Sequence, residues 1–518
     1  MNILEILRDL KMKNVSLYVE DDNIVLGNGR DRLSETLLTE IRRHKVELME
    51  FFRRSPAKTQ IAQPELQPRR EYYELSFMQR NIWVDQKLHP DIQYYNVGSS
   101  WSVHGELDLQ RLQSSIDNVV KQHEILRTGF RIVDWEPKQL IAGNLPWIWD
   151  YRELTGHTEA GLEGIMTEAK NVVFDLESPP LFKIFLIRET EHKHHLIFVI
   201  HHIISDGWSL KVFFEQVIQN YRSGIESRAG ATTYPLQYKD FVGWQIRQLS
   251  ETDIKAKKYF WLEKFKDGKG FFLNPSSSSG KQISFSGTTQ TFEICPARKK
   301  EIYRLCFDLN STPFIALLAM LKITLYCFTG KDRIVVETGV MDRPQGGLAG
   351  QIGPFLSNIP ILVQIDETMT LKDFIKLVRT EFICSLAHKE YPIHLIKKDI
   401  KLLHQEFNGL TNISFTFHND GLLSEEEVRV DGLLIVKSDY KIAKVIKGIS
   451  FHCFDVKDSL TLNVDYSDEL FDKQFIDEFA DKFLKILDSI GKSSDTTIRE
   501  LARSVSGTAE MEFSFNFF

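Results

Sequence analysis

The sequence predicts a globular protein of alternating helices and strands, in the α/β or α+β class. Of its 518 residues, 42% are hydrophobic and 26% are charged, which is an ordinary composition for a folded chain. At typical domain sizes this length provides for roughly two to four folded units. Helical periodicity over 108–122 and 162–172 surrounds strand-like apolar runs at 181–187 and 196–200. This mixture of the two periods predicts the fold class.

A second alternation of strands and helices follows in the C-terminal half. Its apolar patterns have the lengths of ordinary strands and helices. Strands are expected near 334–338, 359–363, 413–417 and 460–464, and helices near 312–326, 371–386 and 475–490. We therefore divide the main part of the chain into two similar lobes, 71–250 and 251–503, followed by a tail at 504–518.

Residues 1–54 have a pattern of their own. Apolar residues recur at helical spacing over 3–10 and again over 33–52. Between these regions, two short alternating runs flank positions 21–23, which predicts a β-hairpin. Residues 55–70 contain three prolines and three glutamines with little apolar content, which is typical of a linker. We expect a small helix–hairpin–helix unit joined to the lobes by this linker.

The charge and cysteine content exclude several classes of protein. A net charge of −7 and a pI near 6.1 give no electrostatic reason to bind nucleic acid. Five scattered cysteines without a CxxC pair argue against a disulfide framework or a zinc site and fit a reducing cytoplasm. Charged residues among the first ten exclude a signal-peptide core, and the longest apolar runs, such as 314–321, are too short to span a membrane. We expect a soluble cytoplasmic protein.

The segment 200–210, IHHIISDGWSL, carries the most specific chemical signal. It follows an apolar run, so its side chains stand at a strand-to-loop junction, where reactive groups are held on rigid support. His202 can act as a general base or as a hydrogen-bond acceptor for a nucleophile. Asp206 could orient the loop by pairing with an arginine, and Gly207 permits the close approach of a substrate chain.

Other interpretations of this segment compete with the catalytic one. An adjacent histidine pair is more often structural than catalytic. A zinc site would need histidines at helical spacing or nearby cysteines, and neither is present. A serine hydrolase would carry a GxSxG nucleophile elbow, which the sequence lacks. The residues alone leave the function open.

The segment HHIISDGWS resembles the HHxxxDGWS signature of condensation domains from nonribosomal peptide synthetases. Six further segments resemble the other motifs of this family, in the same order. They are LSFMQRNIW (75–83), HEILRTGF (123–130), YKDFVGW (238–244), IGPFLSNIP (352–360), HKEYPI (388–393) and NISFTFHN (412–419). Three residues depart from the family pattern: Ser357 stands where valine is commoner, and Lys389 and Glu390 stand where glutamine and aspartate are usual. The resemblance spans about residues 72–490.

The resemblance implies an α+β fold of two chloramphenicol-acetyltransferase-like lobes, arranged as a V with a central tunnel. Donor and acceptor peptidyl carrier proteins would dock at opposite tunnel mouths, each presenting a thioester on a phosphopantetheine arm. The reaction is peptide-bond formation by acyl transfer. No metal is implied, and no cofactor bound by the chain itself.

The same resemblance assigns roles within the site. His202 is expected midway along the tunnel as the catalytic histidine, and backbone N–H groups near Gly207 are candidate oxyanion donors. Asp206 is expected to be structural and to pair with Arg343. Arg127 is a second candidate for this network, with an ordinary helix-end arginine as the alternative. The residues expected to support the site are His201, Asp206, Trp208, Ser209, Arg127 and Arg343.

The intact motif also bears on the subclass. It excludes the cyclising relatives, and its Gly-Trp-Ser order argues against the epimerising ones. Because the first motif lacks a PLSPMQ-type start, we expect an L-configured aminoacyl or peptidyl donor. A starter domain with a fatty-acyl donor remains an alternative. A non-catalytic recruitment scaffold is a further alternative, and it predicts a damaged motif.

The N-terminal segment resembles the docking domain at the start of some hybrid peptide/polyketide synthetase subunits. That domain binds the C-terminal tail of the upstream subunit, which implies strand addition to the hairpin and basic residues for an acidic tail. The residues concerned are Ser16, Tyr18, Val19, Ile24, Val25, Arg30, Arg32, Arg42, Arg43 and Lys45. A capping subdomain of the catalytic unit is the alternative. Without adenylation or carrier motifs, we expect a free-standing subunit or an excised part of a larger synthetase.

Overall fold

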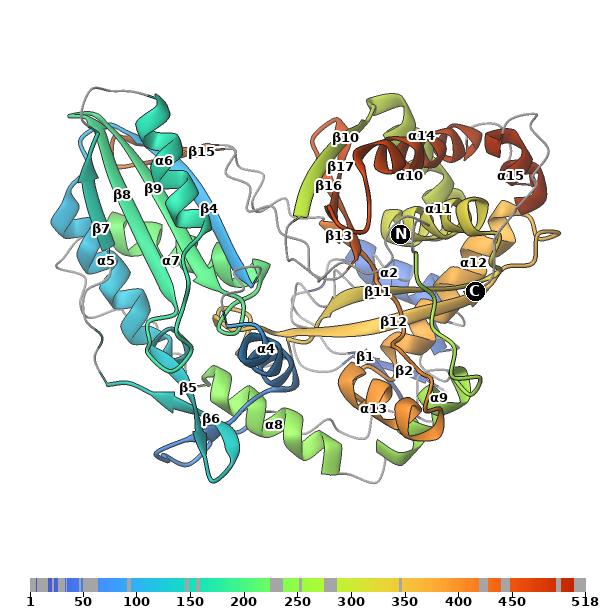
Figure 1. The fold of residues 1–518 in the computed structure, drawn as a ribbon, viewed down its shortest axis with the longest axis horizontal. Helices are drawn as coiled ribbons and strands as arrows, with labels where there is room; N and C mark the ends of the chain where they lie inside the picture. Colours follow the sequence, from blue (N-terminus) through green and yellow to red (C-terminus); the bar gives the residue numbers. More distant parts are fainter. Residues whose placement is uncertain are drawn as a thin grey trace. The chain divides into compact units, whose positions relative to one another are not determined.

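The computed structural model describes most of the chain (Figure 1). The described residues are Ile6, 17–20, 23–26, Leu33, 35–45, 48–49, 64–90, 95–143, 145, 149–154, 159–223, 236–250, 254–273, 287–343, 347–418, 427–438, 448–490 and 495–506. The chain divides into two units, one of residues Met1–Gln63 and one running from Pro64 to the C-terminus apart from Pro344–Gly346.

The N-terminal unit contains the predicted hairpin. β1 (Leu17–Glu20) pairs antiparallel with β2 (Asn23–Leu26), and α2 (Glu35–Arg43) lies in the second region of helical spacing. The helix expected over 3–10 lies outside the described residues except for Ile6, which is buried. The hairpin carries four of the predicted docking residues, Tyr18, Val19, Ile24 and Val25. Three more lie at the end of α2 or just after it, Arg42, Arg43 and Lys45. The remaining three, Ser16, Arg30 and Arg32, lie outside the described residues.

The N-terminal lobe is built on a six-stranded mixed sheet of order β14-β15-β4-β9-β8-β7 (Figure 1). Its strands from this half of the chain are β4 (Asn96–His104), β7 (Trp149–Glu153), β8 (Phe182–Thr190) and β9 (Lys193–His201). β8 and β9 contain the two predicted apolar runs. Alternate residues along β8 belong to two different core clusters, so both faces of the sheet are covered.

Helices cover the two faces of this sheet. α5 (Leu109–Gln122) and α7 (Gly207–Ser223) contribute to the larger cluster, and α6 (Glu159–Lys170) contributes to the smaller one. α4 (Phe77–Leu88) and α8 (Tyr238–Ser250) lie in the same lobe. A small sheet of order β3-β6-β5 completes it, formed by Tyr73–Glu74, Glu136–Ile141 and Thr128–Val133.

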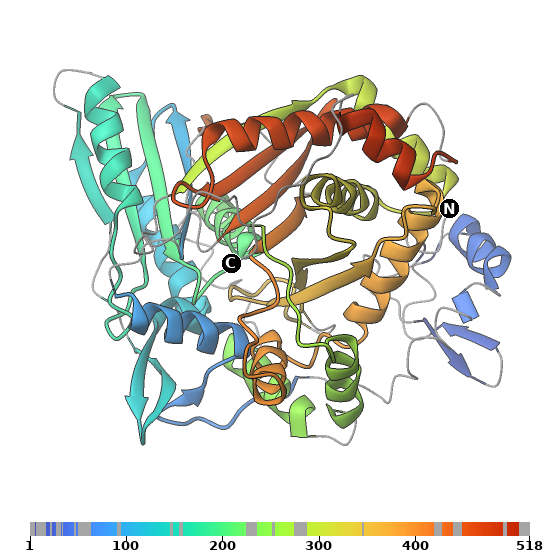
Figure 2. The same ribbon diagram turned by 45° about the vertical axis from the view of Figure 1, so that its right-hand side comes forward.

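The C-terminal lobe has a second six-stranded sheet, of order β10-β17-β16-β13-β11-β12. Its strands are β10 (Gly287–Ile294), β11 (Arg333–Met341), β12 (Leu356–Gln364), β13 (Ile413–His418), β16 (Ile449–Val456) and β17 (Ser459–Ser467). Its helices are α9 (Ile254–Lys264), α10 (Pro296–Asp308), α11 (Pro313–Thr329), α12 (Leu371–Leu386), α13 (Ile393–Leu403), α14 (Lys473–Ile490) and α15 (Ile498–Ser506). In Figure 2, α14 (red) runs across this sheet, and α15 packs against α11 and α14. The strands and helices predicted for this half are confirmed.

Two stretches of the second half of the chain belong to the N-terminal lobe. β14 (Glu427–Val430) and β15 (Leu433–Ser438) form a hairpin, and β15 pairs antiparallel with β4. The described residues 342–343 and 347–355 lie between β11 and β12, and we call them the crossing segment. They bury Leu348, Ile352 and Phe355 in the core of the N-terminal lobe. The predicted division at 250/251 therefore does not separate the lobes, because the second half supplies strands and core side chains to the first.

The predicted linker is shorter than its composition suggests. Residues from Pro64 on belong to the main unit. The amide of Gln67 donates to the Asp240 carboxylate of α8 (2.6 Å). Gly243, one helical turn further, makes room for this segment, since a Cβ there would lie 2.5 Å from the Gln67 side chain. The carboxylate on α8 thus fixes 64–70 against the lobe, and 55–63 lie outside the described residues.

α11 is the most completely buried helix of the C-terminal lobe. Its start is fixed by Thr312, whose side chain accepts from the Ile315 amide (3.3 Å), and it ends at Gly330 in the left-handed conformation. Twelve of its 17 residues are buried, and most of these are apolar. Among the described residues, no single helix meets the length and hydropathy that a membrane span requires, and one bent pair, α10 with α11, meets them by length and composition only.

One lysine stands within this apolar helix. Lys322 is fully buried, and its Nζ donates to the carbonyls of Ile334 on β11 (3.3 Å) and Ile361 on β12 (2.7 Å). It therefore bridges the two strands that carry the crossing segment. Burial holds the pKa of the Lys322 ammonium well below its ordinary value.

We expect Lys322→Met to reduce the pH dependence of stability. Because the native pKa is lowered, unfolding at any pH between that value and about 10.4 takes up a proton, so stability rises with pH across this window. The contribution is up to about 1.4 kcal/mol per pH unit. Denaturant unfolding at several pH values measures it, with the exposed Lys300→Met on α10 as control. A constant difference in unfolding free energy between wild type and Lys322→Met across this window would contradict the assignment.

Candidate active site

The histidine pair lies where β9 meets α7. β9 ends at His201 and α7 begins at Gly207, so residues 202–206 form a short loop between them. The amide of His202 donates to the carbonyl of Tyr95, the residue before β4 (2.6 Å). β9 is an interior strand with buried neighbours on both sides, so the loop rests on rigid support.

His201 is a structural residue. Its Nδ1 accepts a hydrogen bond from the Ile203 amide (3.1 Å), and its Nε2 lies 3.4 Å from Gln86 Oε1. With Nδ1 accepting, the ring proton resides on Nε2. Burial, and to a smaller extent the neighbouring His202, lowers the pKa of this imidazole to about 3. His201 is therefore neutral at physiological pH, and its hydrogen bond to the Ile203 amide ties the ring to the loop.

His202 differs from its neighbour. The residue is half-buried, and its Nδ1 atom is shielded from solvent and makes no hydrogen bond to any described residue. Buried polar atoms in proteins almost always have a partner. The imidazole of His202 is thus not committed to a protein group at this atom, whereas that of His201 is.

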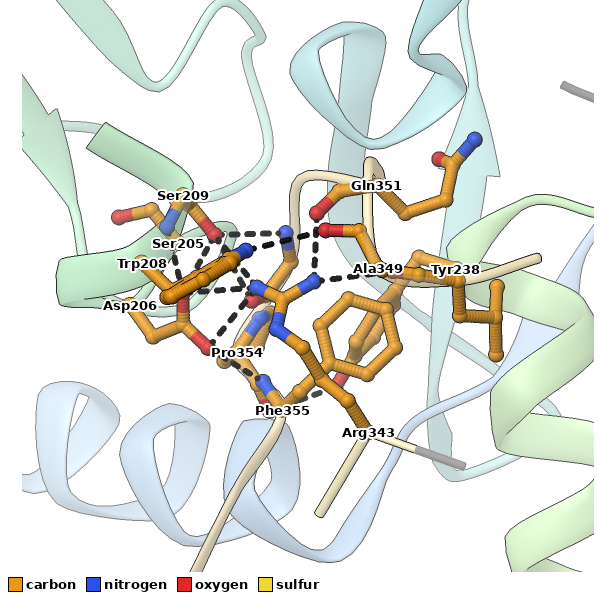
Figure 3. A network of polar contacts seen from close by, with 12 residues as sticks. Ser205, Asp206, Trp208, Ser209, Tyr238, Arg343, Ala349, Gln351, Pro354 and Phe355 are labelled. Carbon is orange, nitrogen blue, oxygen red and sulfur yellow. Dashed lines mark hydrogen bonds and ion pairs between the residues drawn. The ribbon is translucent and has the colours of Figure 1, made fainter. Parts of the chain in front are cut away.

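Asp206 is the centre of the polar network in Figure 3. Its carboxylate caps α7 by accepting from the amide (2.7 Å) and the hydroxyl (2.6 Å) of Ser209. It also accepts from the Phe355 amide (3.1 Å), and one guanidinium nitrogen of Arg343 lies 3.0 and 3.2 Å from its two oxygens. The side chains of Asp206 and Arg343 are only 2% and 8% exposed. The predicted pair is therefore present, and it is buried.

Arg343 is held by its own segment as well. Its second terminal nitrogen donates to the carbonyls of Leu348 (3.1 Å) and Gln351 (2.7 Å), and its guanidinium lies 4.2 Å from the centre of the Phe355 ring. Burial lowers the pKa of the guanidinium, and the Asp206 carboxylate opposes that shift. Arg343 thus binds two carbonyls of the crossing segment and, through Asp206, links this segment to the start of α7.

The residues after Asp206 complete this attachment. Trp208 Nε1 donates to the carbonyl of Ala349 (3.0 Å), and Ser209 Oγ accepts from the Gly353 amide (3.0 Å). Gly353 must be glycine, because a Cβ there would lie 2.1 Å from the ring of Tyr238. Gly207 is exposed, and apart from its chain neighbours and its own helix backbone no described heavy atom lies within 4 Å of the Cβ that it lacks. A substrate can therefore approach the first turn of α7 at Gly207.

One predicted supporting residue lies elsewhere. Arg127 donates to the carbonyls of Val120 (3.2 Å), Ala142 and Gly143 (3.3 Å), so it joins the end of α5 to the end of β6. It contacts neither Asp206 nor Arg343 among the described interactions. The expectation that it joins their network is wrong, because these carbonyls already take its donors.

The structure adds residues to the network that the motifs alone did not identify. His123 is fully buried, with Nε2 2.7 Å from Gln216 Oε1 on α7 and Nδ1 3.2 Å from Gln351 Oε1 on the crossing segment. Burial lowers the pKa of His123. Its place in the HEILRTGF segment was the one available signal. Phe355 enters through its backbone amide, which no side-chain pattern predicts.

Four of the motif-like segments meet around a cavity of about 30 Å³. It is lined by α4, α8, the start of β12 and the turn before α13, and includes Trp244, Asn358 and Lys389. This volume holds about one water molecule. Among the described residues, no group of three or more His, Cys, Asp or Glu side chains is arranged to hold a metal ion.

The sequence profile described as "Condensation domain" matches residues 69–510. Among curated proteins, bacitracin synthase 2 of Bacillus licheniformis is 24% identical over 514 residues, which cover 97% of this chain and 19% of that protein. The chain thus spans about a fifth of the length of this relative.

Two solved structures are similar in fold. The X-domain from teicoplanin biosynthesis matches with a TM-score of 0.74 and 19% identity, covering 85% of this chain and 99% of the other. The starter condensation domain of rhizomide synthetase, a mutant in complex with C8-CoA, matches with a TM-score of 0.70 and 16% identity, covering 83% and 96%. Because the family profile covers most of the residues, the chain belongs to the condensation-domain family of nonribosomal peptide synthetases, whose members form amide bonds by acyl transfer between carrier-bound substrates.

Proposed function

We propose that this chain transfers an aminoacyl or peptidyl group from a donor carrier-protein thioester to the α-amine of an aminoacyl thioester on a second carrier. The observation that carries the proposal is the contrast within the histidine pair. His201 is committed to the fold at both nitrogens, whereas His202 has an uncommitted Nδ1 and stands on a loop that the Asp206–Arg343 pair holds in place.

Amide formation from an amine and a thioester requires a proton acceptor for the amine and hydrogen-bond donors for the developing oxyanion. The acceptor nitrogen attacks the donor thioester carbon, a C–N bond forms and the C–S bond breaks. The amine loses one proton, and the pantetheine sulfur leaves as a thiolate that takes up a proton. His202 can accept the amine proton or hold the amine in line with the carbonyl. The N-terminal amides of α7 near exposed Gly207 offer donors for the developing oxyanion.

The alternatives concern the donor and the activity. We favour an L-configured aminoacyl or peptidyl donor, and a fatty-acyl donor is the alternative that the fold of the rhizomide starter domain illustrates. The similar fold of the teicoplanin X-domain, which also appears in a complex with OxyB, illustrates a recruitment role. The intact network around His202 supports catalysis over recruitment.

We further propose that residues 1–54 are a docking domain for the C-terminal tail of an upstream subunit. The β1–β2 pair offers a strand edge, and Arg42 and Arg43 present basic groups at the end of α2. Donor and acceptor carriers would then come from other domains or subunits, in the cytoplasm. The family profile begins at residue 69, so this assignment rests on the segment itself.

His202→Ala should slow condensation by about 10²–10⁴-fold, because positioned acid–base groups contribute this much. Stability should change little, since Nδ1 has no partner among the described residues. Single-turnover mass spectrometry of the acceptor carrier measures the rate. The exposed His192→Ala, in the turn before β9, is the matched control and should react at the wild-type rate. Wild-type condensation by His202→Ala would remove this residue from the mechanism.

Parallel reactions with octanoyl and L-aminoacyl donors separate the two donor classes.

Asp206→Ala should lose both activity and stability. It leaves the buried Arg343 guanidinium without its carboxylate, and such losses typically cost about 3–5 kcal/mol. Denaturant unfolding measures the loss. The double variant Asp206→Ala/Arg343→Met should be less destabilised than Asp206→Ala, because no buried charge is left unpaired. If Asp206→Ala unfolds at the same denaturant concentration as wild type, the pair does not support the site.

Deleting residues 1–54 should leave a protein that condenses substrates from carriers supplied at high concentration. It should lose its preference for a donor carrier fused to the upstream subunit's C-terminal tail, because recruitment through the tail raises the effective concentration. Rates at low carrier concentration, with tailed and tail-less donors, measure this preference. The docking proposal fails if the tail accelerates the full chain and the deletion variant equally.

A further inference from the structure

Two of the three departures from the family pattern meet at one carboxylate. Ser357 on β12 donates from its hydroxyl to Asp342 Oδ2 (3.2 Å), and Lys389 Nζ lies 2.7 Å from Asp342 Oδ1. The side chains of Asp342 and Lys389 are 8% and 20% exposed. Asp342, at the N-terminal end of the crossing segment, therefore contacts two residues that are unusual for the family, Ser357 and Lys389, which come from different motifs.

Lys389 is itself firmly supported. It lies in the turn between α12 and α13, where the indole of Trp261 on α9 donates to the carbonyl of His388 (3.0 Å). The third departure, Glu390, lies 3.2 Å from Lys257 Nζ, also on α9. The ammonium of Lys389 therefore reaches Asp342 from a fixed point of the C-terminal lobe.

Asp342 is linked to the catalytic loop in two ways. It directly precedes Arg343, which binds Asp206. Its amide also donates to the carbonyl of Phe355 (2.8 Å), and the amide of the same Phe355 donates to Asp206 Oδ2 (3.1 Å). A continuous series of polar contacts thus runs from Lys389 through Asp342 and Phe355 to Asp206.

We propose that Lys389 is a positioning residue for condensation and that it acts through Asp342 on the Asp206–Arg343 pair. Without the ammonium, the Ser357 hydroxyl is the one side-chain partner that the buried Asp342 carboxylate keeps among the described residues. Moving toward water then lowers the free energy of this carboxylate, and Arg343 and Phe355, which belong to the same crossing segment, move with it. This inference rests on the proposed function, since its effect is measured on the condensation reaction.

The test uses the full chain and four variants at the pair. Lys389→Met removes the charge, and Lys389→Gln places the residue that the family pattern carries. Lys389→Arg keeps the charge, and Asp342→Asn/Lys389→Gln removes both charges together. Lys299→Met is the matched control, because Lys299 lies 2.6 Å from Asp455 in the same lobe with similar exposure (16% and 18%) and takes no part in the crossing segment.

We expect Lys389→Met and Lys389→Gln to lower kcat by about 10- to 10²-fold, the loss that small misplacements of reacting groups produce. KM for either carrier should be unchanged, because Lys389 does not bind them. Lys389→Arg and the double variant should recover most of the rate. Lys299→Met should lower the melting temperature while leaving kcat at the wild-type value.

Three outcomes would overturn the inference. One is a wild-type kcat for both Lys389→Met and Lys389→Gln in an assay where His202→Ala is slowed by about 10²-fold or more. Another is a raised KM with unchanged kcat, which would make Lys389 a carrier-binding residue. The third is a double variant no faster than Lys389→Gln. If the wild-type chain forms no amide with any donor, the proposed function is wrong, and so is this inference. If the wild-type chain is active and one of the three outcomes above is observed, only the inference about Lys389 is wrong.

Discussion

The buried ion pair between Asp206 and Arg343 determines how the rest of the site is arranged. A charge taken out of water is costly unless it is paired and hydrogen-bonded. Here the carboxylate accepts from a backbone amide and a hydroxyl of α7, from a backbone amide of the crossing segment, and from the guanidinium. It also lies at the N-terminus of α7, where the helix dipole favours negative charge. Four independent donors therefore fix one side chain, and each donor belongs to an element that the site needs.

This arrangement explains how two identical neighbouring residues acquire different properties. His201 ends an interior strand, and its ring turns into the core, where burial keeps it neutral. His202 is the first residue of the loop, is half-buried, and makes no hydrogen bond at Nδ1 to any described residue. The loop is fixed at its C-terminal end. Asp206 caps α7 there and cannot move without breaking its ion pair with Arg343. The position of the loop that carries His202 thus depends on a carboxylate four residues further along the chain.

The sequence predicted the elements that depend on local pattern. The hairpin in residues 1–54, the apolar runs in β8 and β9, and the helices of the C-terminal half all have periodicity that is visible in one stretch of chain. The pairing of Asp206 with Arg343 came from family resemblance, since the two residues are far apart in sequence. β14 and β15 could not be assigned to their lobe, because short alternating strands do not specify which sheet they join. Arg127 shows the same limit, as its residue type fits an ion pair or a set of carbonyls equally well. The composition of 64–70 predicted a linker. The structure instead places these residues in the main unit, where the Asp240 carboxylate of α8 accepts from the Gln67 amide.

The exchange of strands between the two halves of the chain constrains how such a protein can be recombined. The N-terminal lobe contains β15 against β4 and the apolar side chains of the crossing segment, although both come from the second half of the sequence. Consider a chimera of two such proteins, joined at a single point between the halves. Its β4 would pair with a β15 strand from the other protein, and its Asp206 would pair with an arginine from the other protein. Inheritance of one lobe without the other therefore requires several coordinated junctions. In this chain, moving the whole two-lobed unit keeps β15 with its β4 and Arg343 with its Asp206.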